Sequence, residues 1–507
     1  MSGISIGGSS FMIKKLVSEL PEVYQPIFGH SELSGQVSRS CEDRLKSIIQ
    51  VYDSLQKSLG RPLNILDLGC AQGYFSLNLA KHGATVCGVD FLDKNIAVCR
   101  ALANENPDLN VDFENCLIED IAYRIKNDQY DLVLGLSVFH HIVHQKGIKV
   151  VQDLLEHLAN KCGCLLIEMA LREEPLYWAP AQPKDPREMI EAIAFIHEVA
   201  RYETHLAPVA RPLFIASNRY WILGDISAKF DEWTFESHAL ADGTHQRSRR
   251  YYFNNDTVLK MYRLDHPRGD FNQAEILRES DFLGNIPLNF SAPKLRFSGK
   301  SSRDIWIAVE KLPGNLLLEL IREEVDFDCH AILISVLNEL VALEAAGLYH
   351  DDIRTWNVLV DEEKVFLIDH GSISKIKQDC VWPKNIFLAF LIFVKEVVSG
   401  VTDNSQGLRT ISMSPYGLPS IYGKWASLLW RYPIDNWSFK LMLEVLNETS
   451  FDDSDEFRYM PIEAWMNAIE TVIQIQKNNR NWHLKMFSLI RLRWRNFKKM
   501  MRERSMN

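Results

Sequence analysis

An Asp, an Asn and a second Asp near residue 350 have the types and spacing that phosphoryl transfer needs. In YHDDIRTWNVLVDEEKVFLIDHG, residues 349–371, the pattern H-x-D-x-x-x-x-N ends at Asn357, and Asp369 follows an apolar strand. Kinase chemistry is mainly positioning: one Asp accepts the proton of the attacking hydroxyl, while an Asn and another Asp hold Mg²⁺. The spacing therefore predicts Asp352 as the catalytic base and Asn357 and Asp369 as metal ligands.

Other residues around this pattern have the types that would bind ATP. In kinases a strand Lys paired with a helix Glu grips the phosphates, and the strand TVLKMY and the helix after it supply both. The sequence VEKL at 309–312 is typical of a hinge whose backbone pairs with adenine, and an apolar residue after the Asn would lie beneath the base. The predicted ATP-binding residues are Lys260, Glu279, Glu310, Lys311, Leu312 and Leu359.

Three features depart from the usual kinase pattern. The turn before the strand Lys is Asn-Asn-Asp in place of a Gly-rich loop, Asp351 replaces an Arg, and His370 replaces a Phe. Because that Arg would pair with an activation-loop phosphate, its replacement favours a constitutive small-molecule or glycan kinase over a regulated protein kinase. An inactive kinase is the rival interpretation, against which the Lys and both metal ligands argue. Solvated acids in a turn are the other alternative.

A second group of candidate residues lies far upstream, in ILDLGCAQGYF. A strand ends there at Asp67, and Gly69, Ala71 and Gly73 form a loop of small residues that lets a ligand approach a helix N-terminus. A dinucleotide fingerprint would need Gly at 69, 71 and 74, so the spacing excludes NAD. Asp90 closes the next strand, where a carboxylate can accept both hydroxyls of a ribose. A tight turn and a helix N-cap are the structural alternative.

The spacing D-x-G-x-A-x-G is similar to motif I of the class I S-adenosylmethionine-dependent methyltransferases, which implies a bound S-adenosylmethionine. Three histidines in VFHHIVH, at 140, 141 and 144, invite a metal or a general base. Their spacing does not support a metal site. A role in catalysis stays open.

The elements around the loop at 67–73 alternate between strand and helix. Strands are predicted at 63–69, 85–90, 130–138 and 164–171, with helices at 74–83, 94–106 and 150–161 between them. Such alternation with apolar strands predicts a parallel, doubly wound α/β sheet covered on both faces. We expect this Rossmann-like methyltransferase domain to span residues 1–212 and a linker to span 213–246, where the pattern becomes mixed polar and aromatic.

The site of Asp352, Asn357 and Asp369 is expected in a two-lobed, kinase-like α+β domain over residues 247–475. A hairpin is predicted in RYYF-NND-TVLKMY, then a helix through AEILRESDFL, a strand DIWIAVE and a long helix that ends at Gly347. The apolar run at 386–394 is too short to span a membrane and predicts a buried helix. Helices dominate after the second Asp.

Composition places the chain among globular proteins of a reducing compartment. Of its 507 residues 47% are apolar and 24% charged, and its nine cysteines are scattered without zinc-ligand spacing. The first twenty residues lack the pattern of a signal peptide, so a cytoplasmic location is expected.

The net charge of −10 conceals a basic end. Residues 477–507 hold ten Lys or Arg and one acid, about +9, and the preceding chain carries 46 − 65 = −19. The predicted tail helix, 476–507, is amphipathic and could lie in an anionic membrane surface, dock to a partner protein, or pack on the kinase-like domain. Nucleic acid is not an expected partner, because the body is acidic and has no binding module.

Longer strings surround both sites, namely VSELPEVYQPIFGH, LDLGCAQGYFSL, GLSVFHHIVH, HDDIRTWNV and VEKLPG. On these strings nearly the whole chain resembles the WbdD-like family, bifunctional kinase/methyltransferases that terminate polymannose O-antigen chains of lipopolysaccharide. The resemblance implies ATP- and Mg²⁺-dependent phosphorylation of the non-reducing terminal mannose of an undecaprenol-linked glycan. Methylation of that phosphate with S-adenosylmethionine would follow.

The same resemblance implies further site residues and partners. An N-terminal segment is expected to close over the methyl donor, and other residues to line its adenine. The residues so implied are Tyr24, Gln25, Arg44, Cys116, Leu117, Ile118 and Leu136. The implied partners are the lipid-linked polymannose acceptor and a polymannose mannosyltransferase, at the cytoplasmic face of the inner membrane, which the tail would contact.

Two other function classes stay open at this point. One is a sugar O-methyltransferase whose kinase domain is an inactive scaffold for a mannosyltransferase. The other is a recruitment platform with no turnover at either site. Methylation of a phosphate oxygen that is already ionised needs alignment and no general base.

Overall fold

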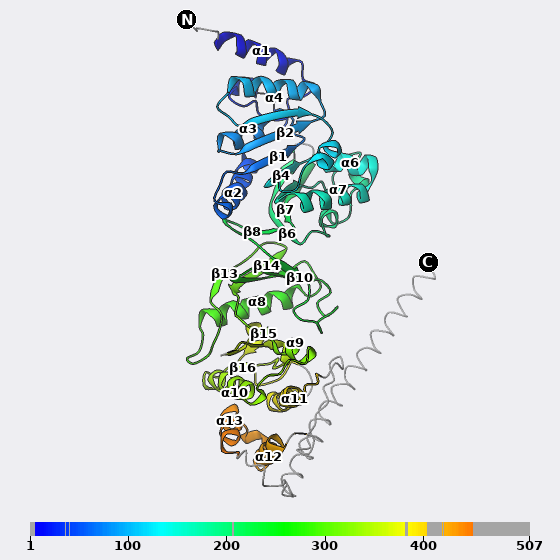
Figure 1. Ribbon diagram of the computed structural model, residues 1–507. Helices are drawn as coiled ribbons and strands as arrows, with labels where there is room; N and C mark the ends of the chain where they lie inside the picture. Colours follow the sequence, from blue (N-terminus) through cyan, green and yellow to red (C-terminus); the bar gives the residue numbers. More distant parts are fainter. Residues whose placement is uncertain are drawn as a thin grey trace, which may run out of the picture. The chain divides into compact units, whose positions relative to one another are not determined.

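The computed structural model describes residues 6–35, 37–39, 41–204, 207–362, 364–380, 384–402, 418 and 420–449 (Figure 1). The chain divides into two compact units, Met1–Thr234 with Tyr252–Asn255 and Phe235–Tyr251 with Asp256–Asn507. The expected tail helix, 476–507, lies outside the described residues. No described helix combines the length and apolarity needed to cross a membrane.

The first unit is built on a seven-stranded sheet with strand order β3-β2-β1-β4-β5-β7-β6. The five strands from β3 to β5 are parallel, and β7 is antiparallel to both β5 and β6. The sheet strands are β1 (Asn64–Leu68), β2 (Thr85–Asp90), β3 (Val111–Asn115), β4 (Leu132–Leu136), β5 (Cys164–Glu168), β6 (Phe195–Thr204) and β7 (Ala207–Ser217). The helices are α1 (Ile6–Ser18), α2 (Glu42–Leu59), α3 (Tyr74–Lys81), α4 (Asp93–Glu105), α5 (Ile118–Arg124), α6 (Phe139–Lys146) and α7 (Ile148–Lys161).

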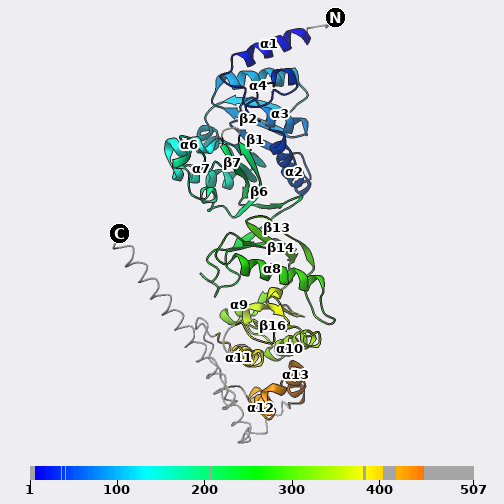
Figure 2. The ribbon, with the colours of Figure 1, turned by 180° about the vertical axis from the view of Figure 1, so that it is seen from behind.

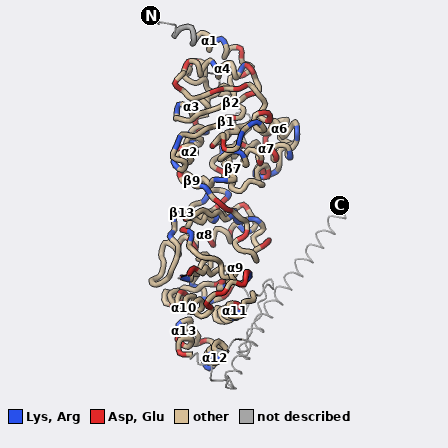
Figure 3. Tube along the Cα trace, viewed as in Figure 1, with Lys and Arg blue, Asp and Glu red and all other residues tan. Residues whose placement is uncertain are grey.

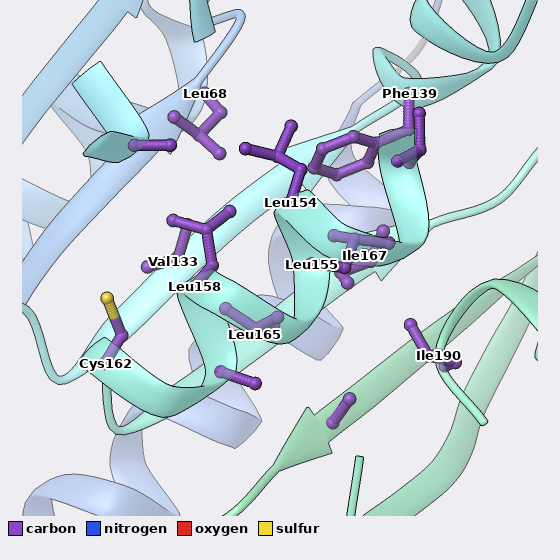
Figure 4. Packing of buried hydrophobic residues seen from close by; sticks show 14 of the residues in the cluster. Leu68, Val133, Phe139, Leu154, Leu155, Leu158, Cys162, Leu165, Ile167 and Ile190 are labelled. Atoms are coloured by element: carbon purple, nitrogen blue, oxygen red, sulfur yellow. The ribbon is translucent and has the colours of Figure 1, made fainter. Parts of the chain in front are cut away.

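Alternate strand residues bury on opposite faces of this sheet, as the pleat requires. One face carries a cluster that includes Leu66, Leu68, Val133 and side chains of α5, α6 and α7 (Figure 4). The other carries Phe113 with side chains of α1, α3 and α4. In both views α6 and α7 lie across the sheet from α2 and α3 (Figures 1 and 2). The doubly wound α/β prediction is confirmed.

The linker predicted at 213–246 is wrong over its first part. Residues 213–217 complete β7, which pairs with both β5 and β6, and a hairpin of β8 (Tyr220–Leu223) and β9 (Ile226–Lys229) follows, then β10 (Glu232–Thr234). The first unit thus extends to Thr234. Residues 213–217 and 221–223 are buried, but the polar and charged residues that follow each of these short runs give the segment a mixed composition that resembles a linker.

The second unit begins with a sheet in which β11, β12, β14 and β13 are neighbours in that order. The bounds here are β11 (Arg249–Phe253), β12 (Thr257–Arg263), α8 (Gly269–Gly284), β13 (Leu295–Lys300) and β14 (Asp304–Glu310). The predicted hairpin, helix and strand are confirmed. Acidic and basic residues are interspersed along the described elements of each unit (Figure 3).

The rest of the second unit is mainly helical, as predicted. It contains β15 (Asn315–Leu316), α9 (Leu317–Arg322), α10 (Cys329–Ala345), β16 (Tyr349–His350), β17 (Val358–Val360), β18 (Val365–Leu367), β19 (Ile373–Ser374), α11 (Ile386–Ser399), α12 (Ser420–Leu429) and α13 (Phe439–Glu448). Helix α10 ends next to Gly347, whose φ of 70° is left-handed. The apolar run at 386–394 is the buried part of α11, which confirms the predicted core helix.

Candidate active sites

The loop between β1 and α3 has the backbone that a close-fitting ligand requires. Gly69, Ala71 and Gly73 have φ values of 70°, 49° and 77°. A Cβ added at Gly69 would lie 2.3 Å from Cγ1 of Val138, so only glycine fits there. Ala71 holds its unusual conformation while its amide donates to Oδ2 of Asp90 at 3.0 Å. The three small residues are therefore fixed by geometry at the start of α3.

The two predicted carboxylates of this loop have different surroundings. Asp67 is 2% exposed, and Oγ of Ser76 donates to it at 2.6 Å. Burial raises the pKa of Asp67 to about 6, although the Ser76 bond opposes the rise. The Asp67–Ser76 hydrogen bond therefore joins β1 to α3, on either side of the loop. Asp90 accepts from the Leu92 amide at 2.8 Å and from Asn95 at 3.2 Å through Oδ1. Its Oδ2 accepts from the Ala71 amide and has a second lone pair for a ribose hydroxyl.

The N-terminal segment is tied to the loop by two glutamines. The amides of Tyr24 and Gln25 donate to Oε1 of Gln72 at 3.1 and 2.9 Å, and the amide of Tyr74 donates to Oε1 of Gln25 at 3.1 Å. Gln72 is buried and also donates to Asn95 at 2.8 Å. The structure therefore brings Tyr24 and Gln25 to the cofactor loop. Gln72 was not predicted, although it lies inside the motif.

The residues expected around adenine follow β3 and β4. The Cys116 amide donates to the Asp90 carbonyl at 3.2 Å, Leu117 precedes α5, Ile118 begins it, and Leu136 ends β4. Phe91 directly follows Asp90 and is 71% exposed. An exposed ring beside the ribose carboxylate suits adenine stacking, and its position after the strand-ending acid was the signal available in the sequence.

Arg44, one of the predicted cofactor-binding residues, lies in a buried charged group. It is 2% exposed, and its Nε donates to Oε2 of Glu168 at 2.6 Å while Nη2 donates to the Glu203 carbonyl at 2.9 Å. Arg39, which sequence reasoning missed, contacts the other oxygen of Glu168. Glu168 ends β5. The carboxyl edge of the sheet thus carries a buried charged group beside the cofactor loop.

The candidate bases near this edge are not suited to proton removal. Burial acts to raise the pKa of Glu168, but the guanidiniums of Arg39 and Arg44 outweigh it and hold the pKa below its ordinary value. Burial lowers the pKa of His140 to about 2, and His141 adds to the shift, so His140 is neutral. Among the described residues no group of three or more His, Cys, Asp or Glu could hold a metal ion.

In the second unit the structure brings Lys260 and Glu279 together as predicted. Nζ of Lys260 donates to both oxygens of Glu279, at 2.7 and 2.9 Å, from β12 to the buried face of α8. Burial acts to lower the pKa of Lys260, but Glu279 and Asp369 outweigh it and raise the pKa above its ordinary value. Lys260 is thus a fixed cation whose charge also influences Asp369.

Asp352, Asn357 and Asp369 also lie as a kinase site needs them. Nδ2 of Asn357 donates to Oδ2 and to the carbonyl of Asp352, both at 2.8 Å, which orients the carboxylate. His350 is buried, and its Nε2 lies 2.9 Å from the Ile368 carbonyl beside Asp369. Asp369 has a left-handed φ of 63° and accepts from Oγ of Ser372 at 2.8 Å. The base and both metal ligands are therefore held by neighbouring backbone.

These residues fit a bound Mg²⁺. Because the amide nitrogen of Asn357 is committed to Asp352, its oxygen is left for a cation. Asp369 supplies carboxylate oxygen, the ligand type that Mg²⁺ prefers, and phosphates and water normally complete its shell. Burial acts to raise the pKa of Asp369, but Lys260 outweighs it and keeps the carboxyl ionised.

The predicted hinge follows β14. The amides of Glu310 and Lys311 donate to the carbonyls of Lys294 and Asp256, both at 2.9 Å, so neither amide is free for adenine. The backbone amide of Leu312 is left as the candidate donor to the base. Leu359 lies on β17 opposite Phe366.

His370 packs as the aromatic residue that it replaces would. Its ring stacks on Phe282 and meets Phe290 edge-on at 5.9 Å, and its Nδ1 lies 3.9 Å from Glu279. The carbonyl of the next residue, Gly371, accepts from Nε of Arg278 at 2.8 Å, which ties α8 to this segment. His370 therefore belongs to the packing behind the site, apart from the metal ligands.

An ion pair that sequence reasoning missed fixes the catalytic loop. Arg354 is 1% exposed and donates to both oxygens of Asp379, at 3.0 and 2.9 Å, while its Nε lies 3.4 Å from Oδ1 of Asp352. Asp351 stands beside this group. Burial, and then the charges of Asp352 and Asp369, raise the pKa of Asp351 to about 7.

Comparison with known proteins bears on both units. Residues 65–161 match the family model of a methyltransferase domain. A relative from Escherichia coli, the O-antigen chain terminator bifunctional methyltransferase/kinase WbdD, is 42% identical over 478 residues, which are 92% of this chain and 68% of the relative.

Two solved structures of WbdD are similar to this chain. One, at low resolution with an ordered C-terminal bundle, has a TM-score of 0.85 and 41% identity and covers 96% of this chain and 99% of its own. Another, at medium resolution, has a TM-score of 0.81 and 41% identity and covers 91% of this chain and 100% of its own.

Proposed function

This chain belongs to the WbdD family of bifunctional methyltransferase/kinases, and we propose that it terminates polymannose O-antigen chains by phosphorylating the terminal mannose and then methylating that phosphate. The observation that carries the proposal is the presence on one chain of two formed sites. The Lys260–Glu279 pair with the oriented Asp352 serves one, and the Gly69–Gly73 loop serves the other. A capped end has no free hydroxyl at the phosphorylated position.

In the kinase step, Asp352 accepts the proton of the mannose hydroxyl. The Asn357 amide holds the carboxylate in one orientation, and Nε of Arg354 lies 3.4 Å from its other oxygen. Lys260 grips the ATP phosphates from a position fixed by Glu279. Mg²⁺, when bound at Asn357 and Asp369, offsets charge on the transferred phosphoryl group.

In the second step the protein needs to bind and align its substrates. A phosphate monoester is ionised near neutral pH, so no proton has to be removed and no general base is needed. Neither Glu168, which is paired with Arg39 and Arg44, nor His140, whose pKa is lowered, is suited to act as one. S-adenosylmethionine, when bound at the loop after β1, supplies a methyl group activated by its sulfonium. The fixed loop and Asp90 hold this donor.

The acceptor would be a lipid-linked glycan, and the work of the enzyme would take place at the cytoplasmic face of the inner membrane. The basic composition of residues 476–507 supports peripheral contact with anionic lipid, and a polymannose mannosyltransferase is the proposed partner. Truncation after residue 476 should move the protein from the membrane to the soluble fraction. An unchanged distribution would refute anchoring by the tail.

The function is tested by mass spectrometry of a synthetic mannan acceptor after incubation with ATP, Mg²⁺ and S-adenosylmethionine, each omitted in turn. We expect a phosphate with ATP and Mg²⁺ alone, and a methyl phosphate only when all three are present. Asp352→Asn should abolish phosphorylation, with Asp361→Asn, on the β17–β18 turn, as the matched control. Methylation without ATP would instead indicate a sugar O-methyltransferase.

A further inference from the structure

Buried arginines converge on Ser137, the residue after β4. Nη1 of Arg39 donates to the Ser137 hydroxyl at 2.6 Å, and Nη1 of Arg211 donates to it at 3.2 Å. Arg211 also makes a bidentate contact with Glu174 at 2.8 and 2.7 Å. We call the buried group of Arg39, Arg44, Arg211, Glu168 and Glu174 the arginine cluster. Within the cluster Arg39 and Arg44 share Glu168, and Arg44 also pairs with the partly exposed Asp43 at 3.1 Å.

This cluster has donors that the protein does not use. Nε of Arg39 is buried and has no hydrogen-bond partner among the described residues. Within the described part of the chain, Nη1 of Arg211 has the Ser137 bond and a contact with Glu168 at 3.9 Å. A buried guanidinium N–H without an acceptor destabilises the fold unless a ligand pairs with it. An anion with several acceptor oxygens could accept from both Arg39 and Arg211.

The cluster lies where a substrate of the methyltransferase would bind. Ser137 is half-buried and has a left-handed φ of 59°, a strained conformation of the kind found at functional sites. It follows the carboxyl end of β4, the strand that pairs with β1, so it neighbours the cofactor loop. Ligands of parallel sheets bind at this edge. An anion bound by Arg39 and Arg211 would therefore lie next to the methyl donor.

Aromatic residues extend from the cluster to the surface. The Arg211 guanidinium lies 5.1 Å from the centroid of the buried Trp178 ring. The adjacent Tyr177 is 69% exposed, its hydroxyl lies 3.4 Å from Nδ1 of His141, and its ring meets His144 edge-on at 5.1 Å. An exposed aromatic ring with polar neighbours suits the apolar face of a sugar.

We propose that the arginine cluster is the acceptor site of the methyltransferase, in which Arg39 and Arg211 bind a sugar phosphate monoester and Tyr177 packs against the sugar. The proposal rests on the proposed function. A phosphate oxygen forms the bond to the methyl carbon as the carbon–sulfur bond breaks and its electrons stay on sulfur. The dianion becomes a methyl phosphodiester monoanion, and no proton moves.

This site also explains why phosphorylation has to come first. A phosphate dianion offers charged acceptor oxygens to the Arg39 and Arg211 donors, whereas a mannose hydroxyl offers only a neutral acceptor and a weaker bond. Sites built for a hydrogen-bonded or charged group reject analogues that lack it, because their own buried groups are then unsatisfied. The cluster thus selects the kinase product over the unphosphorylated chain.

The test is a methyltransferase assay with a synthetic mannoside phosphate and radiolabelled S-adenosylmethionine. Loss of a charge-assisted bond predicts that Arg39→Gln raises KM for the phosphorylated acceptor about tenfold to a hundredfold. Arg39→Lys, which keeps the charge, should recover part of this loss. Tyr177→Ala, at an exposed position, should raise the same KM. Arg61→Gln, which breaks a bidentate pair with Asp131 in the same unit, is the matched control and should leave it unchanged.

Two further measurements separate the possible failures. In the wild type, inorganic phosphate should inhibit methylation in competition with the acceptor, a result that needs no variant to fold. The affinity of Arg39→Gln for S-adenosylmethionine, measured by calorimetry, should stay within about twofold of the wild type. An unchanged KM in Arg39→Gln, or absence of competition by phosphate, would overturn the acceptor site while the proposed function stands. Failure of the wild type to methylate the phosphorylated mannoside would overturn both.

Discussion

His370 stacks on Phe282, with ring centroids 5.4 Å apart and 9° between the ring planes. This contact places the imidazole behind the kinase site, in the packing where a Phe would serve equally well. The departure at position 370 from the usual kinase sequence therefore leaves Asp369 and Asn357 in place. It counts against an inactive kinase domain.

Replacement of His370 tests that packing role. His370→Phe should retain phosphorylation of a mannan acceptor within about threefold, because the apolar contacts are kept and 0.6 kcal/mol corresponds to that factor. His370→Asp should lose most activity, because it adds a carboxylate beside the buried Glu279. The measurement is the initial rate with labelled ATP. A His370→Phe variant as inactive as His370→Asp would show that the imidazole itself is needed.

The buried Lys260–Glu279 pair predicts separate effects on stability and catalysis. Lys260→Met leaves the Glu279 charge unpaired, so it should lower the free energy of unfolding by about 3–5 kcal/mol and abolish phosphorylation. In the double variant Lys260→Met/Glu279→Gln the Glu279 charge is removed together with that of its partner. It should regain most of the stability and none of the activity. Thermal unfolding and the kinase rate are measured together, and a double variant no more stable than the single one contradicts the pairing.

Two glycines with the same backbone conformation distinguish the cost of a left-handed backbone from the steric effect of a Cβ in the loop after β1. Gly69 and Gly60 have φ values of 70° and 69°, but a Cβ at Gly69 would lie 2.3 Å from Val138, whereas one at Gly60 would have nothing within 4 Å. Gly60→Ala should cost about 1–2 kcal/mol of stability and keep S-adenosylmethionine binding. Gly69→Ala should weaken binding in calorimetry and leave phosphorylation intact. Equal affinities in the two variants would remove Gly69 from the cofactor site.

The raised pKa of Asp351 predicts how stability depends on pH. The folded pKa of about 7 lies above the ordinary 3.8, so the folded state binds the proton more tightly and loses this advantage as pH rises from about 4 to 7. Asp351→Asn should therefore show a Tm that exceeds the wild-type value increasingly over this range and by a constant amount above it. Thermal unfolding from pH 4.5 to 8.5 measures this. With the exposed Asp435→Asn as control, a pH-independent difference for Asp351→Asn would contradict it.

Most of what the sequence determined is local. The loop residues 69–73 and the Asp352–Asn357 pair lie within one or two turns of chain, so their spacing alone fixes which groups can meet. Strand and helix alternation, the hairpin at β11 and β12, and the apolar run of α11 follow in the same way from periodicity. The end of β7 and the hairpin of β8 and β9 were mistaken for a linker, because their short apolar runs are interrupted by polar turns and do not alternate with helices.

Only the tertiary structure decided the arginine cluster and its neighbours. Arg39 and Glu168 are 129 positions apart, and neither belongs to a recognisable spacing. Glu168 ends β5 as Asp67 and Asp90 end or nearly end their strands, which was the one available signal. Arg39 gave none, because a lone Arg in a loop usually lies in solvent. Its burial depends on which strand ends come together in the sheet, and sheet order is a property of the folded chain that local spacing does not contain.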